Sequence, residues 1–511
     1  MAGAARPSMA TPIPQNAASF TLDDIARITG GRVLRPGPDV RGISTDTRAI
    51  APGAAFLAIT GERFDGHAFL AQAAERGAAA FILALARGVV DDDDELPPEG
   101  GVVLVPDTLA ALGALARAHR ERWAAAPHPA GPRALVAVAG SAGKTTTTRT
   151  IAALLAGAGR GEVHATLGNL NNAIGVPMTL FGLEARHRFA VVEIGTNQRG
   201  EVATLASVAR PDVAVVTAIG VEHTEGLGTL EDVAEEEGDL FAALPEVGIA
   251  VGNADDPHVV AQIGRAGARR RVGYGAAAGA AYRIAARRPE GLGGAAVRIE
   301  RGGADAISLS VPLLGEAGAL AAAAALGVVE ELLGERLDPE QASRALLAMD
   351  LPADGRLTVI ELADGTAILD DSYNANPVSM RASLRAAAEL AEALGKRLVL
   401  ALGEMRELGA LSAAEHDALG AAAAAVRPAA LLLVGGDAAR AAAAAEAAGV
   451  GAVFVETSAE AAVRARELRI PGDLWLVKGS RGVRMERVVE ALRAGGDPGA
   501  DPARATGLPD M

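Results

Sequence analysis

A short glycine loop between a predicted strand and a predicted helix is the segment of the chain that most clearly carries chemistry. An apolar run over 134–139 leads into Gly140-Ser-Ala-Gly-Lys-Thr145, and a helical pattern follows over 146–155. Such a loop points backbone N–H groups and the positive end of the helix dipole at one place, which suits phosphate. Lys144 adds a charge for the β- and γ-phosphates, and Thr145 offers a hydroxyl oxygen to Mg²⁺. The simpler alternative is an ordinary glycine turn.

Two more side chains of the kind that bind metals follow neighbouring predicted strands. Glu193 comes at the end of the apolar run 190–194, and His223 follows the run 213–217. The carboxyl ends of strands in an α/β sheet open onto one crevice, so both side chains are expected beside the glycine loop. A single His is more often a surface residue. The convergence of three consecutive strand ends nevertheless favours a site.

The strands that position these residues belong to a repeating α/β pattern. Apolar runs at 134–139, 190–194, 213–217 and 248–251 alternate with helical stretches, which predicts a mostly parallel sheet. A second series, at 366–370, 397–402, 430–434 and 474–477, predicts a separate domain of about 140 residues. Segments rich in Pro and Gly at 127–132 and 351–355 mark the boundaries. We therefore predict an α/β protein with a disordered leader (1–18), three domains (19–131, 132–352 and 353–495) and a disordered tail (496–511).

Composition agrees with several packed domains and excludes some classes of function. The chain has 511 residues, of which 50% are hydrophobic, and 48 Lys and Arg against 63 Asp and Glu give a net charge of −15. That charge argues against broad binding to nucleic acid or anionic lipid. With no cysteine, the chain has no disulfides, thiolate metal sites or thiol nucleophiles, and it suits a reducing compartment. No apolar run reaches the ~18 residues of a membrane span, so we expect a cytoplasmic protein.

Throughout its predicted ordered length the chain resembles the ATP-dependent Mur ligases of peptidoglycan synthesis. The resemblance rests on six segments: Gly140–Thr145, Gly168-Asn-Leu-Asn-Asn172, Glu193-Ile-Gly-Thr-Asn-Gln-Arg-Gly-Glu201, Asp370-Asp-Ser-Tyr-Asn-Ala-Asn-Pro377, Gly403-Glu-Met-Arg-Glu-Leu-Gly409 and Val477-Lys-Gly-Ser-Arg481. It implies an N-terminal α/β domain that binds a UDP substrate, a central P-loop mononucleotide-binding domain with a mostly parallel sheet, and a C-terminal Rossmann-like α/β domain.

Within this family, the segments around Tyr373 and Met405 favour ligation of D-Ala-D-Ala to UDP-N-acetylmuramoyl-tripeptide. The implied reaction has two steps: ATP phosphorylates the terminal carboxylate of the tripeptide, and the amine of D-Ala-D-Ala then displaces phosphate. ATP and Mg²⁺ are the implied cofactors, and the two peptides are the implied partners. The implied role is in cell wall synthesis, and through it in cell shape and division. A monomer is expected, although the sequence leaves the oligomeric state open.

The resemblance also implies roles for individual residues. The catalytic set is Lys144, Glu193, His223, Glu237 and Arg356. The ATP-binding set is Gly140, Ser141, Ala142, Gly143, Lys144, Thr145, Thr146, Arg356, Asp371 and Asn374. The metal set is Thr145, Glu193, His223 and Glu237. The substrate-binding set is Ser44, Thr45, Arg48, Gly66, His67, Asn169, Asn171, Asn172 and Asn376. Without the family, the N-terminal members are interpreted as solvated turns and Asp370-Asp371 as a capped strand end.

Two segments depart from the family pattern. Glu237 stands where the family usually has a lysine that takes up CO₂ to form a metal-binding carbamate. Our hypothesis is that the carboxylate of Glu237 replaces the carbamate, through a bridging water or with Glu235 or Glu236; the alternative is a solvated acidic helix face. Ala317, Gly318 and Ala321 replace the family's His-Asn-x-x-Asn. Adenine must therefore be held by other groups, or be bound more weakly or less selectively.

Two other functions remain open from the sequence. The chain is either an active ligase of this kind, a diverged relative that binds a nucleotide or UDP-sugar with weak or no ligase activity, or a sister ligase that adds a single amino acid. The identity of the third residue of the acceptor peptide, diaminopimelate or lysine, is also open.

Overall fold

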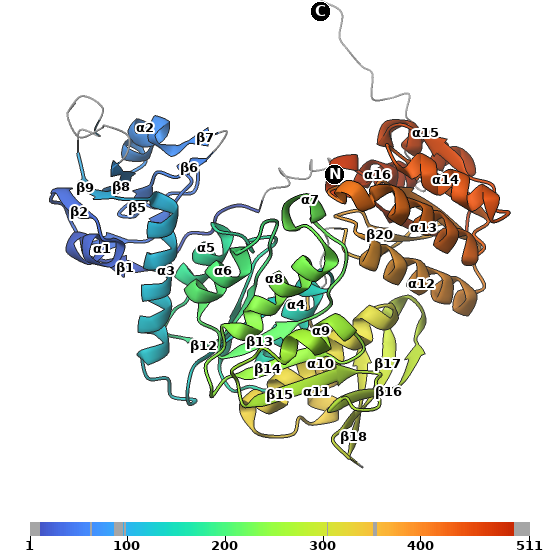
Figure 1. Ribbon diagram of the computed structural model, residues 1–511, viewed down its shortest axis with the longest axis horizontal. Helices are drawn as coiled ribbons and strands as arrows, with labels where there is room; N and C mark the ends of the chain where they lie inside the picture. The colour runs from blue at the N-terminus through green and yellow to red at the C-terminus, as the bar shows by residue number, and fades with distance from the viewer. Residues whose placement is uncertain are drawn as a thin grey trace, which may run out of the picture.

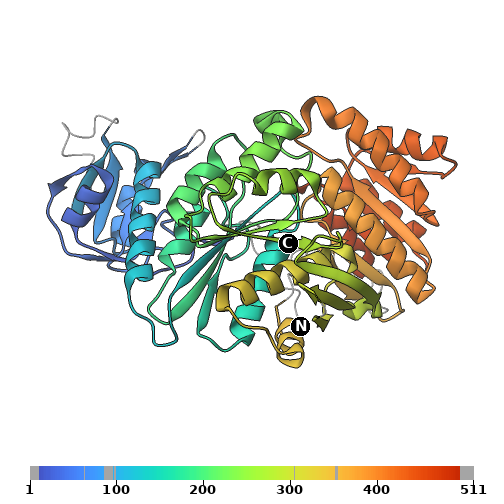
Figure 2. The same cartoon turned by 60° about the horizontal axis from the view of Figure 1, so that its bottom comes forward.

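The computed structural model describes residues 11–61, 64–85, 96, 99–303, 305–350 and 355–494. These residues form three α/β bodies in a row, with the N-terminal body and the C-terminal body on opposite sides of the central one (Figure 1). The second view shows the same order of bodies (Figure 2). The α/β class and the parallel sheets predicted from the sequence are confirmed.

The N-terminal body is built on a five-stranded sheet in the order β2-β9-β8-β5-β4. Its strands are β2 (Arg32–Arg35), β4 (Ile43–Ser44), β5 (Ala55–Leu57), β8 (Ala80–Ala84) and β9 (Gly101–Val105), of which β2 alone pairs antiparallel. Two small pairs, β1 (Ser19–Phe20) with β3 (Val40–Arg41) and β6 (Thr60–Gly61) with β7 (Phe64–Asp65), flank it. The helical segments are α1 (Leu22–Thr29), η1 (Gly66–Phe69), α2 (Leu70–Glu75) and α3 (Thr108–Ala125).

Helix α3 joins this body to the central one. The Trp123 Nε1–H on α3 donates to the carbonyl oxygen of His187 at 3.0 Å, and Arg120 pairs with Asp212 at 2.9 Å. Apolar residues of the N-terminal sheet, of α3 and of the central sheet belong to one continuous core cluster. The predicted boundary at 127–132 therefore falls in a loop, but the apolar packing runs across it.

The central body has a nine-stranded sheet in the order β11-β12-β10-β13-β14-β15-β16-β17-β18. The strands β10 (Ala134–Ala139), β11 (Glu162–Ala165), β12 (His187–Glu193), β13 (Val213–Val216), β14 (Ile249–Asn253) and β15 (Arg270–Gly275) are parallel. The sheet is extended by β16 (Tyr282–Pro289), which is parallel to β15, and then by β17 (Ala295–Arg301) and β18 (Ala306–Val311), each antiparallel to the strand before it. The parallel strands are apolar along most of their length because both faces of the sheet are covered by helices.

The helices of the central body are α4 (Lys144–Gly157), α5 (Gly175–Phe181), α6 (Glu201–Ala209), α7 (Thr224–Leu227), α8 (Leu230–Ala242), α9 (Pro257–Ile263), α10 (Gly315–Leu333) and α11 (Pro339–Leu347), with a 3₁₀ turn η4 (Gly291–Gly293). One core cluster packs the sheet against α4 and α10, and another packs it against α5, α6 and α8.

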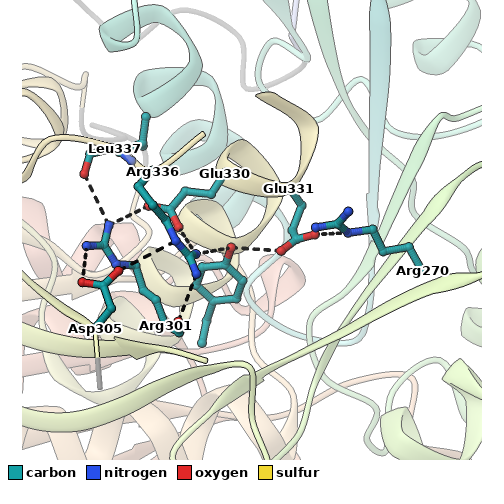
Figure 3. Close-up of polar contacts among 8 residues, drawn as sticks. Arg270, Arg301, Asp305, Glu330, Glu331, Arg336 and Leu337 are labelled. Carbon is teal, nitrogen blue, oxygen red and sulfur yellow. Dashed lines mark hydrogen bonds and ion pairs between the residues drawn. The ribbon is translucent and has the colours of Figure 1, made fainter. Parts of the chain in front are cut away.

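A buried ionic network joins the antiparallel extension to α10 (Figure 3). The side chain of Glu330 is 1% exposed; its Oε1 accepts from Arg301 at 2.9 Å and its Oε2 from Arg336 at 2.6 Å. The N–H of Leu337 also donates to Glu330 Oε1 at 2.9 Å. Because each carboxylate oxygen has a charged donor, this buried anion is fully compensated, and it ties strand β17 to the end of α10.

The C-terminal body has a six-stranded sheet in the order β19-β20-β24-β21-β22-β23. Its strands are β19 (Thr358–Glu361), β20 (Ala367–Asp371), β21 (Leu398–Gly403), β22 (Ala430–Val434), β23 (Val453–Val455) and β24 (Leu474–Lys478), and only β19 is antiparallel to its neighbour. Helices α12 (Pro377–Leu394), α13 (Ser412–Ala425) and α14 (Ala438–Ala447) cover one face, and α15 (Ser458–Leu468) and α16 (Glu486–Ala494) the other. Short 3₁₀ turns are η5 (Gly409–Leu411) and η6 (Arg481–Val483).

The first described residues differ from the prediction of a disordered leader through residue 18. Ala18 is fully buried, the side chain of Asn16 donates to the carbonyl oxygen of Ile43 at 2.8 Å, and Thr11 Oγ1 donates to Asn169 Oδ1 at 2.7 Å. Residues 11–18 therefore pack on the N-terminal and central bodies, a contact between distant segments that composition does not reveal. The predicted leader over 1–10 and the predicted tail over 496–511 lie outside the described residues.

In the described part of the chain, no helix is both long enough and apolar enough to cross a membrane.

Candidate active site

The glycine loop lies at the carboxyl end of β10, between the ends of β12 and β13. Gly140 has φ +124°, and a Cβ added there would lie 2.4 Å from Thr217 Oγ1, so both the conformation and the space require glycine. Gly143 precedes α4 with φ +88°, and no side chain caps this helix. The first N–H groups of α4 are thus left for an anion, as the sequence predicted.

Lys144 begins α4 and is surrounded by carboxylates. Its Nζ donates to the carbonyl oxygen of Gly140 at 2.5 Å. Burial by itself lowers the pKa of Lys144, but the negative charges of Glu222 and of Glu237 and Glu193 outweigh it and raise the pKa above its ordinary value. The ammonium group therefore stays charged at neutral pH and is available to a phosphate.

Thr145 and Glu193 are brought together as predicted. The Thr145 hydroxyl donates to Glu193 Oε2 at 2.7 Å, and the side chain of Asn171 donates to Glu193 Oε1 at 2.8 Å. Arg356, which belongs to the C-terminal body, donates through Nη1 to Thr145 Oγ1. A residue more than 200 positions away in the chain therefore contacts the start of α4.

Glu237 lies beside the glycine loop and not on a solvated helix face. It is fully buried on α8; its Oε2 accepts the Gly140 N–H at 2.7 Å, and its Oε1 has no hydrogen-bond partner among the described residues. Burial raises the pKa of Glu237 to about 8, and Glu222 adds to this, whereas Lys144 and the Gly140 N–H act in the opposite direction.

The two neighbouring glutamates do not join Glu237. Glu236 accepts hydrogen bonds from Thr196, from the N–H of Gly200 and from the N–H of Val202, so it holds the loop after β12. The side chain of Glu235 is 66% exposed and pairs with Arg199 at 3.5 Å. The suggestion that one of them completes a carboxylate pair with Glu237 is therefore not supported.

In the part of the chain that the structure describes, His223 does not form a cluster with the other predicted metal ligands. Its Nδ1 pairs with Glu407 of the C-terminal body, and both residues have positive φ angles, +48° and +65°. Among the described residues, no three His, Asp or Glu side chains are close enough together to hold a metal ion. The predicted four-ligand set is thus not assembled here. The reason is that His223 bonds across the interface between the two bodies.

The loop after β20 supplies the remaining nucleotide residues. Asp371 accepts from Lys478 Nζ at 2.6 Å and from the Ser383 hydroxyl at 2.6 Å. Lys478 also donates to the carbonyl oxygen of Asn374 at 3.1 Å. Asn376 Nδ2 donates to the carbonyl oxygen of Ser141 at 2.9 Å and to Glu222 Oε2 at 3.1 Å. Asn376 therefore ties the C-terminal body to the glycine loop.

Sequence reasoning missed Glu222 and Lys478 as members of the site. Each lies in a segment that was singled out, next to His223 and within Val477–Arg481. For Lys478 the signal was a charged residue directly at the carboxyl end of a buried apolar run, whereas Glu222 follows β13 by six residues. Such a charge is rarely buried without a partner, and here Glu222 is 6% and Lys478 2% exposed.

A cavity of about 230 Å³ opens between the central and C-terminal bodies. The central body contributes Glu222 and His223 to its lining. The charged and amide side chains from the C-terminal body are Asn374, Asn376, Arg406, Glu407 and Arg481. The cavity borders the glycine loop because Asn376, in its lining, donates to Glu222 and to the carbonyl oxygen of Ser141.

The predicted UDP-substrate residues lie in the N-terminal body and in the loop before α5. Arg48 is exposed and pairs with Asp46, and this guanidinium lowers the pKa of the Asp46 carboxyl. Ser44 is buried, and His67 Nδ1 lies 2.8 Å from Asp65 Oδ1. A Cβ at Gly66 would lie 2.8 Å from the nitrogen of Ile59. Thr45 borders β4, and Asn172 accepts the N–H of Gly175 at the start of α5 at 2.9 Å.

The segment that departs from the family pattern lies at an interface between helices. Helix α10 begins at Gly315, where an added Cβ would lie 2.7 Å from the Cβ of Ala386 on α12. Small side chains at the start of α10 thus allow the two bodies to approach closely. Ala317 is exposed, whereas Gly318 and Ala321 are buried.

Comparison with known proteins gives one consistent result. Three family models match the chain: the Mur ligase family catalytic domain at 39–120, the Mur ligase middle domain at 138–329 and the Mur ligase glutamate ligase domain at 355–481. The UDP-N-acetylmuramoyl-tripeptide–D-alanyl-D-alanine ligase of Escherichia coli (strain K12) is 37% identical and covers 94% of this chain and 99% of its own length.

Solved structures agree with this result. MurF from Acinetobacter baumannii aligns with a TM-score of 0.81 at 28% identity, over 94% of this chain and 99% of that one. MurF ligase from Thermotoga maritima in complex with ADP aligns with a TM-score of 0.73 at 26% identity, over 89% and 97%. Because all three domains match and the Escherichia coli relative is similar over almost the whole length, the chain belongs to the Mur ligase family.

Proposed function

We propose that this protein is an ATP-dependent ligase that joins D-Ala-D-Ala to UDP-N-acetylmuramoyl-tripeptide in peptidoglycan synthesis. The products are UDP-N-acetylmuramoyl-pentapeptide, ADP and phosphate. The observation that carries the proposal is the meeting of Lys144, Thr145 and Glu193 with Arg356, which combines a phosphate loop with a cation from the next domain. The activity named for the Escherichia coli relative supports it.

In the first step, the terminal carboxylate of the tripeptide attacks the γ-phosphorus of ATP, and ADP leaves. The residues of this chain mainly position and neutralise negative charge in such a step. The uncapped start of α4, with residues Gly140 to Thr146, holds the phosphates, and Lys144 and Arg356 neutralise them. Asp371 and Asn374 lie in the C-terminal loop that we assign to the ribose side.

A magnesium ion fits the oxygen donors beside this loop. Thr145 Oγ1 and Glu193 Oε2 lie 2.7 Å apart, and Mg²⁺ takes oxygen ligands of this kind. When bound, it would neutralise phosphate charge. We assign Thr145 and Glu193 to it, and Arg356 must release the Thr145 hydroxyl when it binds. His223 joins this set only if it leaves Glu407, and Glu237 only through its unpartnered Oε1.

In the second step, the ammonium group of D-Ala-D-Ala first loses a proton to solvent, and the free amine then attacks the acyl phosphate. Inorganic phosphate leaves and takes up the second proton of the nitrogen. The dipeptide is a zwitterion, and the cavity between the two bodies has both charges in its lining. We assign Arg406 and Arg481 to its carboxylate, and Glu222 to its amine. Glu222 borders the glycine loop through Asn376, so this orientation directs the amine at the phosphorylated carboxylate.

The UDP end of the acceptor is assigned to the N-terminal body. Arg48 can hold a diphosphate with two parallel hydrogen bonds, and Ser44, Thr45, Gly66 and His67 offer polar groups around it. We assign Asn169, Asn171 and Asn172 to the peptide of the acceptor, because Asn171 donates to Glu193 beside the phosphate loop. Because ATP is a substrate made inside cells, the proposed place of reaction is the cytoplasm.

The test is a reaction with the purified full-length protein, UDP-N-acetylmuramoyl-tripeptide, D-Ala-D-Ala, ATP and Mg²⁺. Release of ADP should equal formation of the pentapeptide product by mass spectrometry, and Lys144→Ala should lower the rate about 100-fold or more. Absence of ADP release would support a non-catalytic relative instead. Consumption of a single amino acid in place of the dipeptide would identify a sister ligase.

A further inference from the structure

Tyr373 places one aromatic ring against two cations of the site. The guanidinium carbon of Arg356 lies 4.1 Å from the centre of the ring, and that of Arg481 lies 5.5 Å from it. Arg356 contacts Thr145 at the start of α4, whereas Arg481 lines the cavity between the bodies. One ring therefore touches a residue of the nucleotide side and a residue of the dipeptide side.

The backbone around this ring is held from several sides. The N–H of Tyr373 donates to the carbonyl oxygen of Gly355 at 2.9 Å, directly before Arg356 in the chain. The preceding residue, Ser372, donates through its hydroxyl to Asp370 Oδ1 at 2.6 Å. Lys478 donates to the carbonyl oxygen of the following residue, Asn374, at 3.1 Å. The ring is thus attached to a rigid segment and not to a free loop.

The sheet explains why the two arginines meet at this ring. Strands β20 and β24 are parallel neighbours, with Asp371 opposite Lys478. Tyr373 follows β20 by two residues, and Arg481 follows β24 by three. Arg356 reaches the same edge from the segment before β19. Each side chain therefore arrives at one sheet edge from a different strand.

The ring of Tyr373 can attract both guanidinium groups at this edge of the sheet. Two guanidinium groups near one ring repel each other. Arg481 also pairs with Glu486, at 3.9 Å. The face of an aromatic ring carries negative charge and attracts a cation within about 6 Å of its centre. The other two tyrosines of the chain, Tyr274 and Tyr282, are buried in the central body, so Tyr373 alone has this position.

We infer that Tyr373 is a positioning residue that aims Arg356 at the phosphates and Arg481 at the dipeptide carboxylate through its ring face. The inference rests on the proposed function for the identity of the two ligands. The hydroxyl group is not required, because both contacts are made to the ring. The ring thereby links the two halves of the reaction that the separate bodies bring together.

The kinetic test uses Tyr373→Leu and Tyr373→Met, with Tyr373→Phe as the matched control. Loss of the ring should raise KM for ATP and for D-Ala-D-Ala about 3- to 30-fold each, the range of one cation–π contact. KM for the UDP precursor should stay within about twofold, because its nucleotide end is assigned to another body. Tyr373→Phe should behave as the wild type. A variant that is partly misfolded would instead lower the apparent kcat and leave the KM values unchanged.

A double-mutant cycle separates action through the arginine from a direct contact with substrate. In an Arg481→Ala background, Tyr373→Leu should change KM for D-Ala-D-Ala less than about twofold, because the group that it positions is gone. A full additive effect would overturn the inference. So would unchanged KM values in both Tyr373→Leu and Tyr373→Met, or an equal loss in Tyr373→Phe.

A spectroscopic readout does not depend on turnover. In ¹⁵N-arginine-labelled protein, the Nε–H signals of Arg356 and Arg481, assigned with Arg356→Lys and Arg481→Lys, should carry ring-current shifts. These shifts should persist in Tyr373→Phe and vanish in Tyr373→Leu; their persistence in Tyr373→Leu would contradict the inference. If the wild type shows the shifts but does not use D-Ala-D-Ala, the proposed function fails while the positioning role stands.

Discussion

The carboxylate of Glu237 accepts a hydrogen bond from the backbone N–H of Gly140 at 2.7 Å, so an acidic side chain of α8 supports the first residue of the phosphate loop. Its other oxygen is buried and has no hydrogen-bond partner among the residues that the structure describes. A buried oxygen of this kind costs free energy unless a ligand satisfies it. The contact therefore indicates that Glu237 serves the site and is not a surface residue.

A ligase with glutamate at this position should not depend on CO₂. We expect equal ligation rates in buffer depleted of bicarbonate and in buffer with bicarbonate added, because the carboxylate is already present. Glu237→Gln keeps an oxygen for the Gly140 N–H but can neither ionise nor offer a second carboxyl oxygen beside Lys144, and it should lower the rate about tenfold or more. A strict requirement for bicarbonate, or a fully active Glu237→Gln, would contradict this role.

Asn376 should control the approach of the C-terminal body to the loop. Asn376→Asp keeps an oxygen to accept the Ser379 N–H at the start of α12, but it loses the donor to Ser141 and faces Glu222 with a like charge. We expect kcat/KM to fall about tenfold or more, with little change in the melting temperature. Asn376→Ser, which keeps the cap without the added charge, is the control and should be less affected. Equal rates for all three proteins would rule out a role for this bridge.

The network around Glu330 should contribute to stability and not to catalysis (Figure 3). Glu330→Gln removes the buried charged partner of Arg301, whose side chain is 8% exposed, and leaves it only the half-exposed Asp305. Removing one member of a buried pair costs about 3–5 kcal/mol in the free energy of unfolding. The control is Glu335→Gln, which breaks an exposed pair with Arg160 and should cost less than about 1 kcal/mol. Denaturant unfolding measures both, and equal losses would refute the assignment.

His187 should make the protein sensitive to acid. Burial, the neighbouring His164 ring and Arg186 lower the pKa of His187 from 6.5 to about 4. Between these values the unfolded chain binds the proton and the folded chain does not, so stability falls as the pH drops from 6.5 towards 4. In the folded protein, Nδ1 of the neutral ring accepts the N–H of Glu184 at 3.0 Å.

The variant His187→Gln keeps an acceptor oxygen but does not titrate. Between pH 7 and pH 4.5, the free energy of unfolding of the wild type should fall by about 1–2 kcal/mol more than that of His187→Gln. Parallel pH profiles for the two proteins would contradict the prediction.

Selection of the nucleotide base should be relaxed. Ala317, Gly318 and Ala321 have no side-chain group for a hydrogen bond to a base. Each hydrogen bond that is absent lowers the discrimination between ATP and GTP by about 2- to 10-fold. We therefore expect KM for GTP to lie within about tenfold of KM for ATP in the ligation assay. A preference for ATP of 1000-fold or more would require base contacts that these positions do not supply.

Local sequence patterns were sufficient to predict which residues lie together at the phosphate loop. The glycine loop, Lys144, Thr145 and Glu193 were predicted in one place, and they lie in one place, because strand ends of a parallel sheet share an edge whatever the rest of the chain does. The extension β16 to β18 was not predicted. Its strands alternate between buried and exposed residues, and such strands differ from the continuous apolar runs by which the parallel strands were found.

The amino-acid sequence by itself determined the α/β class, the phosphate loop and the family, because these follow from apolar periodicity and from residues adjacent in the chain. Only the tertiary structure decided that His223 pairs with Glu407, that Arg356 reaches Thr145 and that Tyr373 serves two arginines. These contacts join separate domains, or strands that are neighbours only in the folded sheet. They depend on how whole surfaces pack, which no local pattern of residue types encodes.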